Sequence, residues 1–479
     1  MKPARPQPAS TTGHRPAPDR STVPADNTGR TGDKAPQVAL WQQLIAVAGV
    51  LQAIRGGASG TAALDAVGAA LRPGVQALLF QVLRNLGRAE ALRRQLARRP
   101  PPPDADGLLC TALALCWRAE DAPYEPFTLV NQAVEAAKRH PATRAQASFI
   151  NACLRRFLRE NDALVAATDA DPVARWNHPL WWIKRLQKDH PQHWEQILHA
   201  NNTHAPMALR VNRLQGSQAR YLQELADMGA AADPAGADGL VLHRPLPVQA
   251  LPGFAEGRVS VQDMAAQQAA PLLLDGMDRT RRLRVLDACA APGGKTAHLL
   301  EMAGEGAPLQ VTALEIDATR AERIHQTLSR LRLAAQVLVA DAAQPETWLP
   351  AASSGALFDA ILLDAPCTAS GIVRRHPDVR WLRRETDIAQ LAALQKQLLA
   401  TLWPLLAPGG RLLYCTCSVF RAEGDAQVQT FLAHNTDAHL LPSPGHLIPR
   451  AADKDGAVPD NRFGDHDGFF YALLQKSAD

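Results

Sequence analysis

Apolar residues recur every three to four positions between Val38 and about Asp171, and this spacing predicts a helical N-terminal region. One apolar stripe runs over 41–48 and another over 75–86. Further helices are predicted over 108–116, 131–140 and 144–159. Because proline cannot continue a helix, the four prolines at 100–103 are expected to lie in a loop.

The pattern changes after Asp171. Residues 172–206 are rich in Trp and His, and their helical spacing favours packing against other elements over stacking on nucleic-acid bases. A strand over 207–212, a helix over 216–228 and a strand near 239–243 then predict a small α/β subdomain within a linker region that ends at residue 258.

From residue 259 onward, apolar runs of strand length alternate with helical segments. Strands are predicted at 283–288, 310–315, 336–340, 359–364 and 411–416, and helices at 295–303, 318–331, 387–406 and 423–434. This order predicts a parallel sheet covered by helices on both faces, which is a Rossmann-like α/β fold. Sheets of this kind bind ligands beyond the carboxyl ends of their strands.

The composition limits the possible classes of protein. A chain of 479 residues is too long for one typical domain, and we expect a tail (1–37), a helical domain (38–171), the linker region (172–258) and an α/β domain (259–479). The proline-rich tail has few large apolar side chains, so we expect it to be disordered. No run of 18 apolar residues and no apolar signal segment is present, so neither a membrane span nor secretion is expected.

The seven cysteines are an odd number without paired CxxC spacing, which argues against a disulfide framework and against a zinc site. They suit a reducing cytoplasm. Cys110, Cys116 and Cys153 lie in apolar helical contexts and are expected to fill the core. Cys367 and Cys417 remain as candidate reactive thiols.

The most informative stretch is 285–296, Val-Leu-Asp-Ala-Cys-Ala-Ala-Pro-Gly-Gly-Lys-Thr, where a predicted strand turns into a helix. A phosphate-binding P-loop needs glycine five residues before Gly294, and Cys289 occupies that position. A loop for a nucleoside-bearing cofactor needs instead a carboxylate at the end of the next strand, where Glu315 lies. An ordinary glycine-rich turn is the remaining interpretation of these residues alone.

Two more motifs follow apolar runs, Asp364-Ala-Pro-Cys367 and Thr416-Cys417-Ser418. With Asp287-Ala-Cys-Ala-Ala-Pro-Gly-Gly-Lys295 they resemble the RNA cytosine-C5 methyltransferases that use S-adenosylmethionine, and most of all the bacterial 16S rRNA family called RsmB, Sun or Fmu. The resemblance is strong over 170–479 and looser over 38–170. Segments 127–139 and 149–156 resemble the antitermination factor NusB, so the resemblance implies a NusB-like RNA-binding domain at this end.

The resemblance also implies which residues bind S-adenosyl-L-methionine. The loop residues that would contact its methionine and ribose end are Cys289, Ala290, Ala291, Pro292, Gly293, Gly294 and Lys295. Glu315 would accept hydrogen bonds from the ribose hydroxyls, Asp341 would bond the adenine amino group, and Asp364 would lie beside the cofactor. Asp317 is an alternative to Glu315, although it suits a helix N-cap better.

C5 of cytosine is a poor nucleophile until a thiolate has added to C6. The resemblance makes Cys417 the attacking thiol and Cys367 the thiol that assists release, with Asp364 at N3 of the base and Lys295 ordering the site. DNA cytosine methyltransferases place their nucleophile in a Pro-Cys dipeptide, so Cys367 is the rival nucleophile. Strand alternation puts Cys415 on the same face as Cys417.

Basic residues after Cys367 are the main candidates for contact with RNA. Arg374, Arg375 and His376 are expected to hold phosphates beside a flipped base, and Arg210 and Asn212 are further candidates. On the helical domain, one basic group forms either an RNA-facing strip or a solvated helix face: Lys138, Arg139, Arg144, Arg155 and Arg156. Beyond Cys417 the chain departs from the family's Pro-Glu-Glu-Asn-like turn but keeps Glu423.

We therefore expect a monomeric, cytoplasmic enzyme, without metal or membrane contact, that makes 5-methylcytosine in 16S rRNA, either free or in an early assembly particle. Two alternatives stay open. A related enzyme acting on tRNA is disfavoured by the NusB-like domain, and a non-catalytic RNA-binding assembly factor is disfavoured by the intact Cys367, Cys417 and Asp364.

Overall fold

The computed structural model describes residues 38–118, 120, 122–278, 280–303, 309–353, 356–449 and 465–478. The tail for which we predict disorder lies outside the described residues. Over the described ranges, no helix has both the length and the apolar character that crossing a membrane requires.

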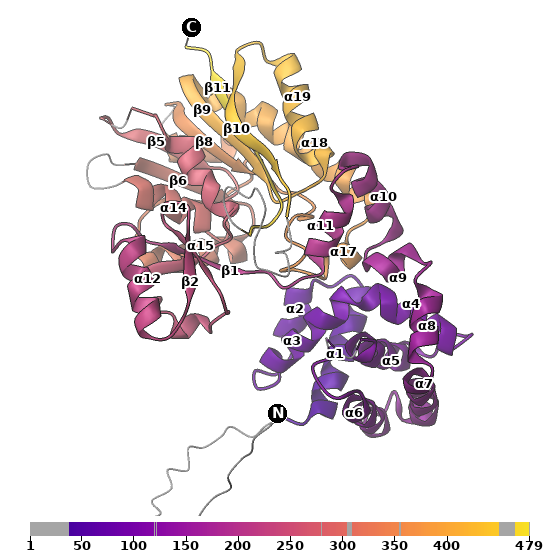
Figure 1. The fold of residues 1–479 in the computed structure, drawn as a ribbon. Coiled ribbons are helices and arrows are strands. Elements are labelled where there is room, and N and C mark those ends of the chain that lie inside the picture. Colours follow the sequence, from indigo (N-terminus) through magenta and orange to yellow (C-terminus); the bar gives the residue numbers. More distant parts are fainter. Residues whose placement is uncertain are drawn as a thin grey trace, which may run out of the picture. The chain divides into compact units, whose positions relative to one another are not determined.

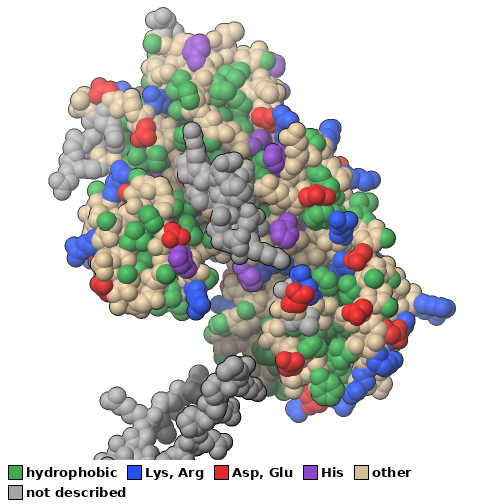
Figure 2. Space-filling model, in the orientation of Figure 1, with side chains coloured by type: hydrophobic (Ala, Val, Ile, Leu, Met, Phe, Trp, Pro, Cys, Tyr) green, Lys and Arg blue, Asp and Glu red, His purple; other side chains and the backbone are tan. Residues whose placement is uncertain are grey.

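The N-terminal region is built of helices, as predicted (Figure 1). They are α1 (Leu40–Arg55), α2 (Gly60–Asp65), α3 (Arg72–Arg84), α4 (Leu86–Leu96), α5 (Pro103–Cys116), α6 (Pro126–Arg139), α7 (Ala147–Arg159) and α8 (Asn161–Thr168). On the outer surface of this region, basic and acidic side chains are interspersed (Figure 2).

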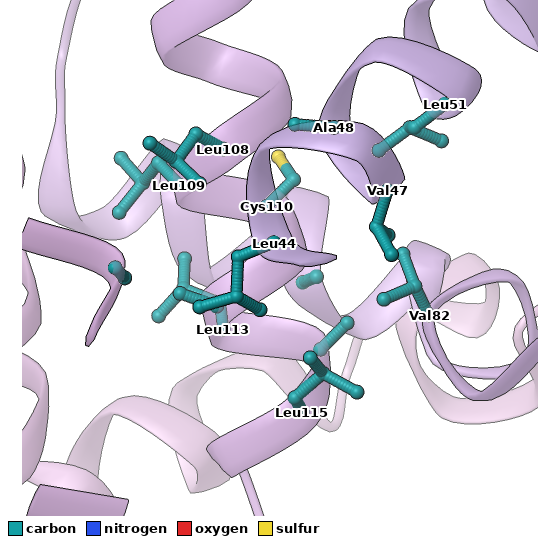
Figure 3. Close-up of a cluster of buried hydrophobic side chains, with 14 of the residues drawn as sticks. Leu44, Val47, Ala48, Leu51, Val82, Leu108, Leu109, Cys110, Leu113 and Leu115 are labelled. Carbon is teal, nitrogen blue, oxygen red and sulfur yellow. The ribbon is translucent and has the colours of Figure 1, made fainter. Parts of the chain in front are cut away.

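The core of the helical region forms around α5, which is buried from Ala105 to Cys116. Figure 3 shows Leu44 and Val47 of α1 in the same cluster as Leu113 of α5. The predicted core cysteines, Cys110, Cys116 and Cys153, are all buried in this cluster. Burial of so many apolar side chains, each contributing about 1.5–3 kcal/mol, holds the helices together.

The linker region begins with three short helices, α9 (Pro172–Trp176), α10 (Leu180–Asp189) and α11 (Trp194–Asn201). As predicted, their aromatic side chains pack: Trp182 is fully buried, and its ring meets that of Phe420 edge-on at 5.0 Å. An antiparallel sheet of order β2-β3-β1-β4 follows. Its elements are β1 (Met207–Val211), α12 (Gln218–Asp227), β2 (Ala232–Ala235), β3 (Gly239–Leu242) and β4 (Val259–Val261).

The C-terminal domain is a seven-stranded sheet of order β10-β11-β9-β8-β5-β6-β7. Its strands are β5 (Leu283–Asp287), β6 (Leu309–Glu315), β7 (Gln336–Val339), β8 (Phe358–Asp364), β9 (Leu406–Thr416), β10 (Ala438–Leu447) and β11 (Phe469–Lys476). Its helices are α13 (Ala269–Leu274), α14 (Gly294–Ala303), α15 (Ala318–Leu331), α16 (Pro345–Ser353), α17 (Val379–Leu382), α18 (Glu385–Leu402) and α19 (Asp425–His434).

The sheet is parallel over the five predicted strands, as expected, and two further strands extend one edge of it. Strands β5 to β9 pair in parallel, but β11 runs antiparallel to β9, and β10 runs antiparallel to β11. Neither β10 nor α16 was predicted. Strand order reverses on either side of β5, where β6 and β8 are its two neighbours, and a sheet opens a ligand crevice at such a point.

Candidate active site

A cavity of about 670 Å³ opens at the carboxyl ends of β5 to β9. The structure places nine of the sequence-predicted residues in its wall: Cys289, Ala291, Pro292, Lys295, Glu315, Asp341, Asp364, Cys367 and Cys417. Three predicted loop residues are not in the wall: Ala290, Gly293 and Gly294. Ala290 is buried in a small apolar cluster with α15 side chains, and the two glycines carry the turn into α14.

The loop after β5 is held by both neighbouring strands. The Ala288 N–H donates to the Leu362 carbonyl of β8, and the Ala290 N–H donates to the Leu314 carbonyl of β6, each at 2.9 Å. Gly293 has a φ of +94°, and a Cβ there would come within 3.2 Å of the Ile324 backbone. Only glycine satisfies both conditions, so the turn into α14 has a defined shape.

Lys295 and Asp364 form an ion pair in the cavity wall, with Nζ and Oδ2 2.6 Å apart. Burial acts to lower the pKa of Lys295, but the charge and the hydrogen bond of Asp364, together with the nearby thiols of Cys415 and Cys417, raise that pKa above its ordinary value. Cys415 donates from Sγ to Asp364 Oδ1 at 3.5 Å and is fully buried. The structure therefore places Cys415 behind Asp364 and outside the cavity wall, whereas Cys417 lies in the wall.

The sulfur atoms of Cys367 and Cys417 lie 3.4 Å apart. Parallel pairing of β8 with β9 sets Asp364 opposite Cys415, so the loops that carry the two thiols leave the sheet side by side. The hydrogen bond with Cys417, together with burial, raises the pKa of Cys367 well above its ordinary value. Cys367 thus keeps its proton more strongly than a free thiol does.

Glu423 holds the two thiol loops together, a role that the sequence did not predict. It is fully buried, and its carboxylate accepts from Thr368 N (2.9 Å), Thr368 Oγ1 (2.5 Å) and Ser418 Oγ (2.6 Å). Thr368 and Ser418 directly follow Cys367 and Cys417. Burial raises the pKa of Glu423, while these donors act to lower it. The one signal in the sequence was that Glu423 survives in an otherwise divergent turn.

The acidic residues at the strand ends lie in the cavity wall as expected. Glu315 ends β6 and accepts from Arg320 Nη1 at 3.1 Å, and Asp341 follows β7. Asp317, the alternative to Glu315, caps α15 by accepting from Arg320 N at 2.8 Å. The wall also contains residues that the sequence did not single out, among them Arg320, Arg383 and Phe469.

The prediction that Arg374 and Arg375 hold RNA phosphates needs correction, because their guanidinium groups are already engaged. Arg374 is fully buried and pairs with Asp467 (2.6 Å) and Asp465 (2.7 Å). Arg375 is one-quarter exposed and pairs with Asp467 (2.5 Å) and Asp263 (2.8 Å). These ion pairs tie the basic loop over residues 371–384 to the segment 465–468 that precedes β11. His376 is exposed, and its contact with RNA stays a prediction.

Arg210 and Asn212 are also interior residues, so their predicted contact with RNA is corrected too. Both side chains are 1% exposed. Arg210 makes a two-pronged ion pair with Glu301, both bonds at 2.9 Å, and Asn212 donates to the Gly257 carbonyl at 3.1 Å. Arg210 thereby joins the linker sheet to α14. From the sequence, its positive charge suggested contact with RNA and not this interior ion pair.

On the helical domain, the basic group from Lys138 to Arg156 lies on the surface, where Arg139 and Arg156 pair with Glu135 and Glu160 one turn away. Its role as an RNA-facing strip stays a prediction.

Family models match three parts of the chain. The model of the 16S rRNA methyltransferases RsmB/F matches residues 273–475, that of the ferredoxin-like domain of RsmF/B-like methyltransferases matches 178–249, and that of the NusB family matches 51–159. These matches confirm the predicted order of a NusB-like helical domain, a small α/β linker domain and a Rossmann-like methyltransferase domain.

Whole-chain relatives agree with these matches. The ribosomal RNA small subunit methyltransferase B of Vibrio cholerae serotype O1 is 39% identical over 441 residues, which cover 90% of this chain and 96% of the relative. The protein of the same name from Escherichia coli O7:K1 is 39% identical over 84% of this chain and 90% of its own length.

Among solved structures, the crystal structure of PH0851 is 25% identical, covers 90% of this chain and 99% of its own, and has a TM-score of 0.69. A methyltransferase homolog from Pyrococcus horikoshii is 26% identical, with a TM-score of 0.52, over 64% of this chain and 98% of its own. On the sequence identity and coverage of the Vibrio and Escherichia relatives, this chain belongs to the ribosomal RNA small subunit methyltransferase B family.

Proposed function

We propose that the protein transfers a methyl group from S-adenosyl-L-methionine to C5 of a cytosine in small-subunit (16S) rRNA, through a transient bond between Cys417 Sγ and C6 of the base. The observation that carries this proposal is the 3.4 Å between the Cys367 and Cys417 sulfurs, in the wall of a cavity that also contains Glu315, Asp341 and the loop after β5. Family membership supports rRNA as the substrate.

The cavity wall suits this cofactor. A carboxylate that ends the strand after a glycine-rich turn accepts hydrogen bonds from ribose hydroxyls, and Glu315 has this position. Asp341 would bond the adenine amino group, and the wall residues 289, 291, 292 and 295 would contact the remainder. When bound, the cofactor supplies an electrophilic methyl group.

The residues of the chain have distinct parts in the proposed reaction. The Cys417 thiolate adds to C6, which makes C5 nucleophilic. Lys295 is the cation beside the thiols, and its ion pair with Asp364 sets that carboxyl in place for N3 of the base. After methyl transfer, the deprotonated Cys367 accepts the C5 proton. The electron pair of that C–H bond restores the C5–C6 double bond, and Cys417 leaves C6 as a thiolate, 3.4 Å from Cys367.

Two other assignments compete with this one. Cys367 would be the nucleophile if the Pro-Cys dipeptide acted as in DNA cytosine methyltransferases. The substrate would be tRNA if the helical domain did not select rRNA. The first assignment predicts a different cysteine in the covalent adduct, and the second predicts a different RNA that loses its 5-methylcytosine.

Bisulfite sequencing of 16S rRNA and tRNA from a strain that lacks the gene tests the proposed function. We expect one 5-methylcytosine to disappear from 16S rRNA and to return with the wild-type gene but not with Cys417→Ala. The purified protein should restore the mark on either free 16S rRNA or an early assembly particle, which identifies the form of the substrate. An unchanged 16S pattern would contradict the proposal, and loss of a mark in tRNA would favour the alternative substrate.

A further inference from the structure

A second cavity, of about 640 Å³, lies between the helical domain and helices α9 to α11. Its size is in the range of small-molecule sites, which span about 300–1,000 Å³. The wall contains Arg84, Arg118, Arg175, Trp117 and Trp176, and every other wall residue is Gln, Asn, His or Thr. None of the described residues in this wall carries a carboxylate, although the chain as a whole has 47 acidic residues to 51 basic ones. This cavity is separate from the candidate active site.

Arg84 is a buried cation in this wall without an anionic partner among the described residues. Its side chain is 7% exposed, Nη2 donates to the Arg374 carbonyl at 2.9 Å, and Nε has no hydrogen-bond partner there. Burial lowers the pKa of Arg84 to about 10. Among the described residues, the buried arginines Arg88, Arg210 and Arg374 pair with carboxylates, so a buried arginine without one is a feature of Arg84 and of its neighbour Arg380.

Arg380 is a second buried guanidinium next to the same wall. It is fully buried and donates to the carbonyls of Asn177 (3.1 Å) and Asn201 (2.6 Å) and to the side chain of Asn202, and Asn177 and Asn202 are wall residues. Burial, and then the charge of Arg84, lower the pKa of Arg380. Two neighbouring buried cations without a counter-charge among the described residues are costly, and a bound anion would offset part of that cost.

The two tryptophans supply flat apolar surface beside these charges. Trp117 has the guanidinium groups of Arg88 and Arg118 over its ring at 5.1 and 4.9 Å, and Trp176 has that of Arg175 at 5.2 Å. Arg118 and Arg175 are exposed at the rim. Stacked arginine and tryptophan planes are surfaces on which unpaired bases stack, while the same arginines contact phosphates.

We propose that the second cavity binds one nucleotide of a single-stranded segment of the RNA substrate, with its phosphate at Arg84 and its base against the tryptophan and arginine planes. Duplex RNA hides its base faces, so the segment has to be unpaired here. The inference rests on the proposed function in that it takes RNA as the substrate. It gives the junction of the helical domain and the linker a direct part in selecting RNA.

The double variant Arg118→Ala/Arg175→Ala tests this inference, with Arg323→Ala, an exposed arginine on α15, as the control. The probe is a 16S rRNA transcript, with Kd measured over a range of salt concentrations. We expect the double variant to weaken binding by about tenfold or more and to reduce the slope of log Kd against log salt by about one to two, because each lost phosphate contact removes about 0.7–0.9. KM for RNA should rise while kcat stays within about twofold.

Crosslinking gives a second readout that does not depend on catalysis. A single-stranded 16S fragment containing 4-thiouridine should crosslink to peptides that contain Trp117 or Trp176, and Arg84→Met should reduce this crosslink without lowering the melting temperature of the free protein. Wild-type affinity and crosslinking in these variants would overturn the inference. The inference would also be overturned if inorganic phosphate or free nucleotides raised the melting temperature of the wild type as much as the RNA does.

The outcomes separate the two proposals. If the variants lose RNA binding but the wild-type protein makes no 5-methylcytosine, the cavity assignment stands and the proposed function fails. If the wild-type protein methylates 16S rRNA and the double variant does so with unchanged KM, the proposed function stands and the cavity assignment fails.

Discussion

At the scale of single residues, Glu423 shows how a buried charge can serve a site that it does not enter. Its carboxylate receives donors from the residues that follow both thiols, so it sets the spacing of Cys367 and Cys417 without lining the cavity. We therefore regard Glu423 as a positioning residue. Removing an acceptor from a buried network costs about 1–3 kcal/mol, because the donors lose their partner.

We expect Glu423→Ala to lower kcat by about ten- to one-hundredfold, a loss of roughly 1.4–2.7 kcal/mol in the barrier, while KM for the cofactor changes little. Glu423→Gln, which can still accept from Thr368 N, should recover part of the rate. Binding of phenylarsine oxide, which bridges two nearby thiols, should weaken in Glu423→Ala and recover in Glu423→Gln. Unchanged binding of this reagent, with the exposed Glu322→Ala as control, would show that Glu423 does not set the thiol spacing.

Asp287, at the end of β5, makes a prediction about pH. Burial raises its pKa to about 7, against about 4 for an exposed aspartate. Between about pH 4 and pH 7 the native state keeps the Asp287 proton, whereas the unfolded state has lost it. The contribution of Asp287 to stability is therefore fully present below about pH 4 and is lost as pH rises to about 7. The free energy of unfolding of the wild type minus that of Asp287→Asn should fall by up to ~4 kcal/mol over this window. A difference that stays flat or rises would contradict the assignment.

At the scale of elements, the segment after Cys367 depends on a glycine with no room for a side chain. The Gly371 N–H donates to the Cys417 carbonyl at 2.9 Å, and the Gly468 N–H donates to the Gly371 carbonyl at 2.9 Å. A Cβ on Gly371 would lie 1.9 Å from the Gly468 carbonyl oxygen. The thiol loop and the approach to β11 therefore pack backbone against backbone.

Gly371→Ala should push these backbones apart and lower kcat by at least about tenfold, together with a clear loss of stability. Gly49→Ala is the matched control, because Gly49 lies in α1 with open space where its Cβ would be. That substitution should raise the free energy of unfolding by about 0.5–1 kcal/mol, since alanine favours a helix interior over glycine. Chemical denaturation and steady-state kinetics of both variants check the pair. Full activity in Gly371→Ala would contradict the packing described.

Helices and strands that form a distinct apolar run are the elements that the sequence predicts best. Helix α15 begins and ends where the apolar period predicts, and the parallel strands β5 to β9 begin or end within a few residues of their predicted bounds, because each is a distinct apolar run. Strand β10 contains Pro442, Pro444 and Gly445, which are typical of a loop, and it is tolerated as a strand because it lies at the sheet edge.

For the site, the motif residues at strand ends were predictable because parallel strands bring their carboxyl ends to one edge. Burial of charged side chains was not predictable. Arg374 and Arg375 look like a surface pair in the sequence, but their partner Asp467 lies more than 90 residues away along the chain, and only the fold brings the three together. The same holds for Arg210 and Glu301.

At the scale of the whole molecule, the basic loop over 371–384 connects the thiols with the helical domain. Asp378 Oδ2 accepts from the Gly60 N–H at 2.9 Å, and the Trp381 indole N–H donates to the Leu83 carbonyl at 2.8 Å. Arg84 of the second cavity donates to the carbonyl of Arg374 in the same loop. The helical domain is thus bonded directly to the loop that follows Cys367.

Asp378→Ala tests this connection. It leaves the buried Gly60 N–H without its acceptor, which should cost about 1–3 kcal/mol of stability. Amide hydrogen exchange should accelerate over both 60–64 and 371–384, while α15 keeps its protection. Acceleration on one side only would mean that the two segments are not coupled.

The central claim is that Cys417 attacks the base and Cys367 releases it. The most direct measurement is the covalent RNA–protein adduct formed with 16S rRNA and S-adenosyl-L-methionine, separated on a denaturing gel and located by mass spectrometry of the linked peptide. We predict that Cys417→Ala forms no adduct and that Cys367→Ala accumulates one through Cys417. An adduct that persists in Cys417→Ala and disappears in Cys367→Ala would contradict the account.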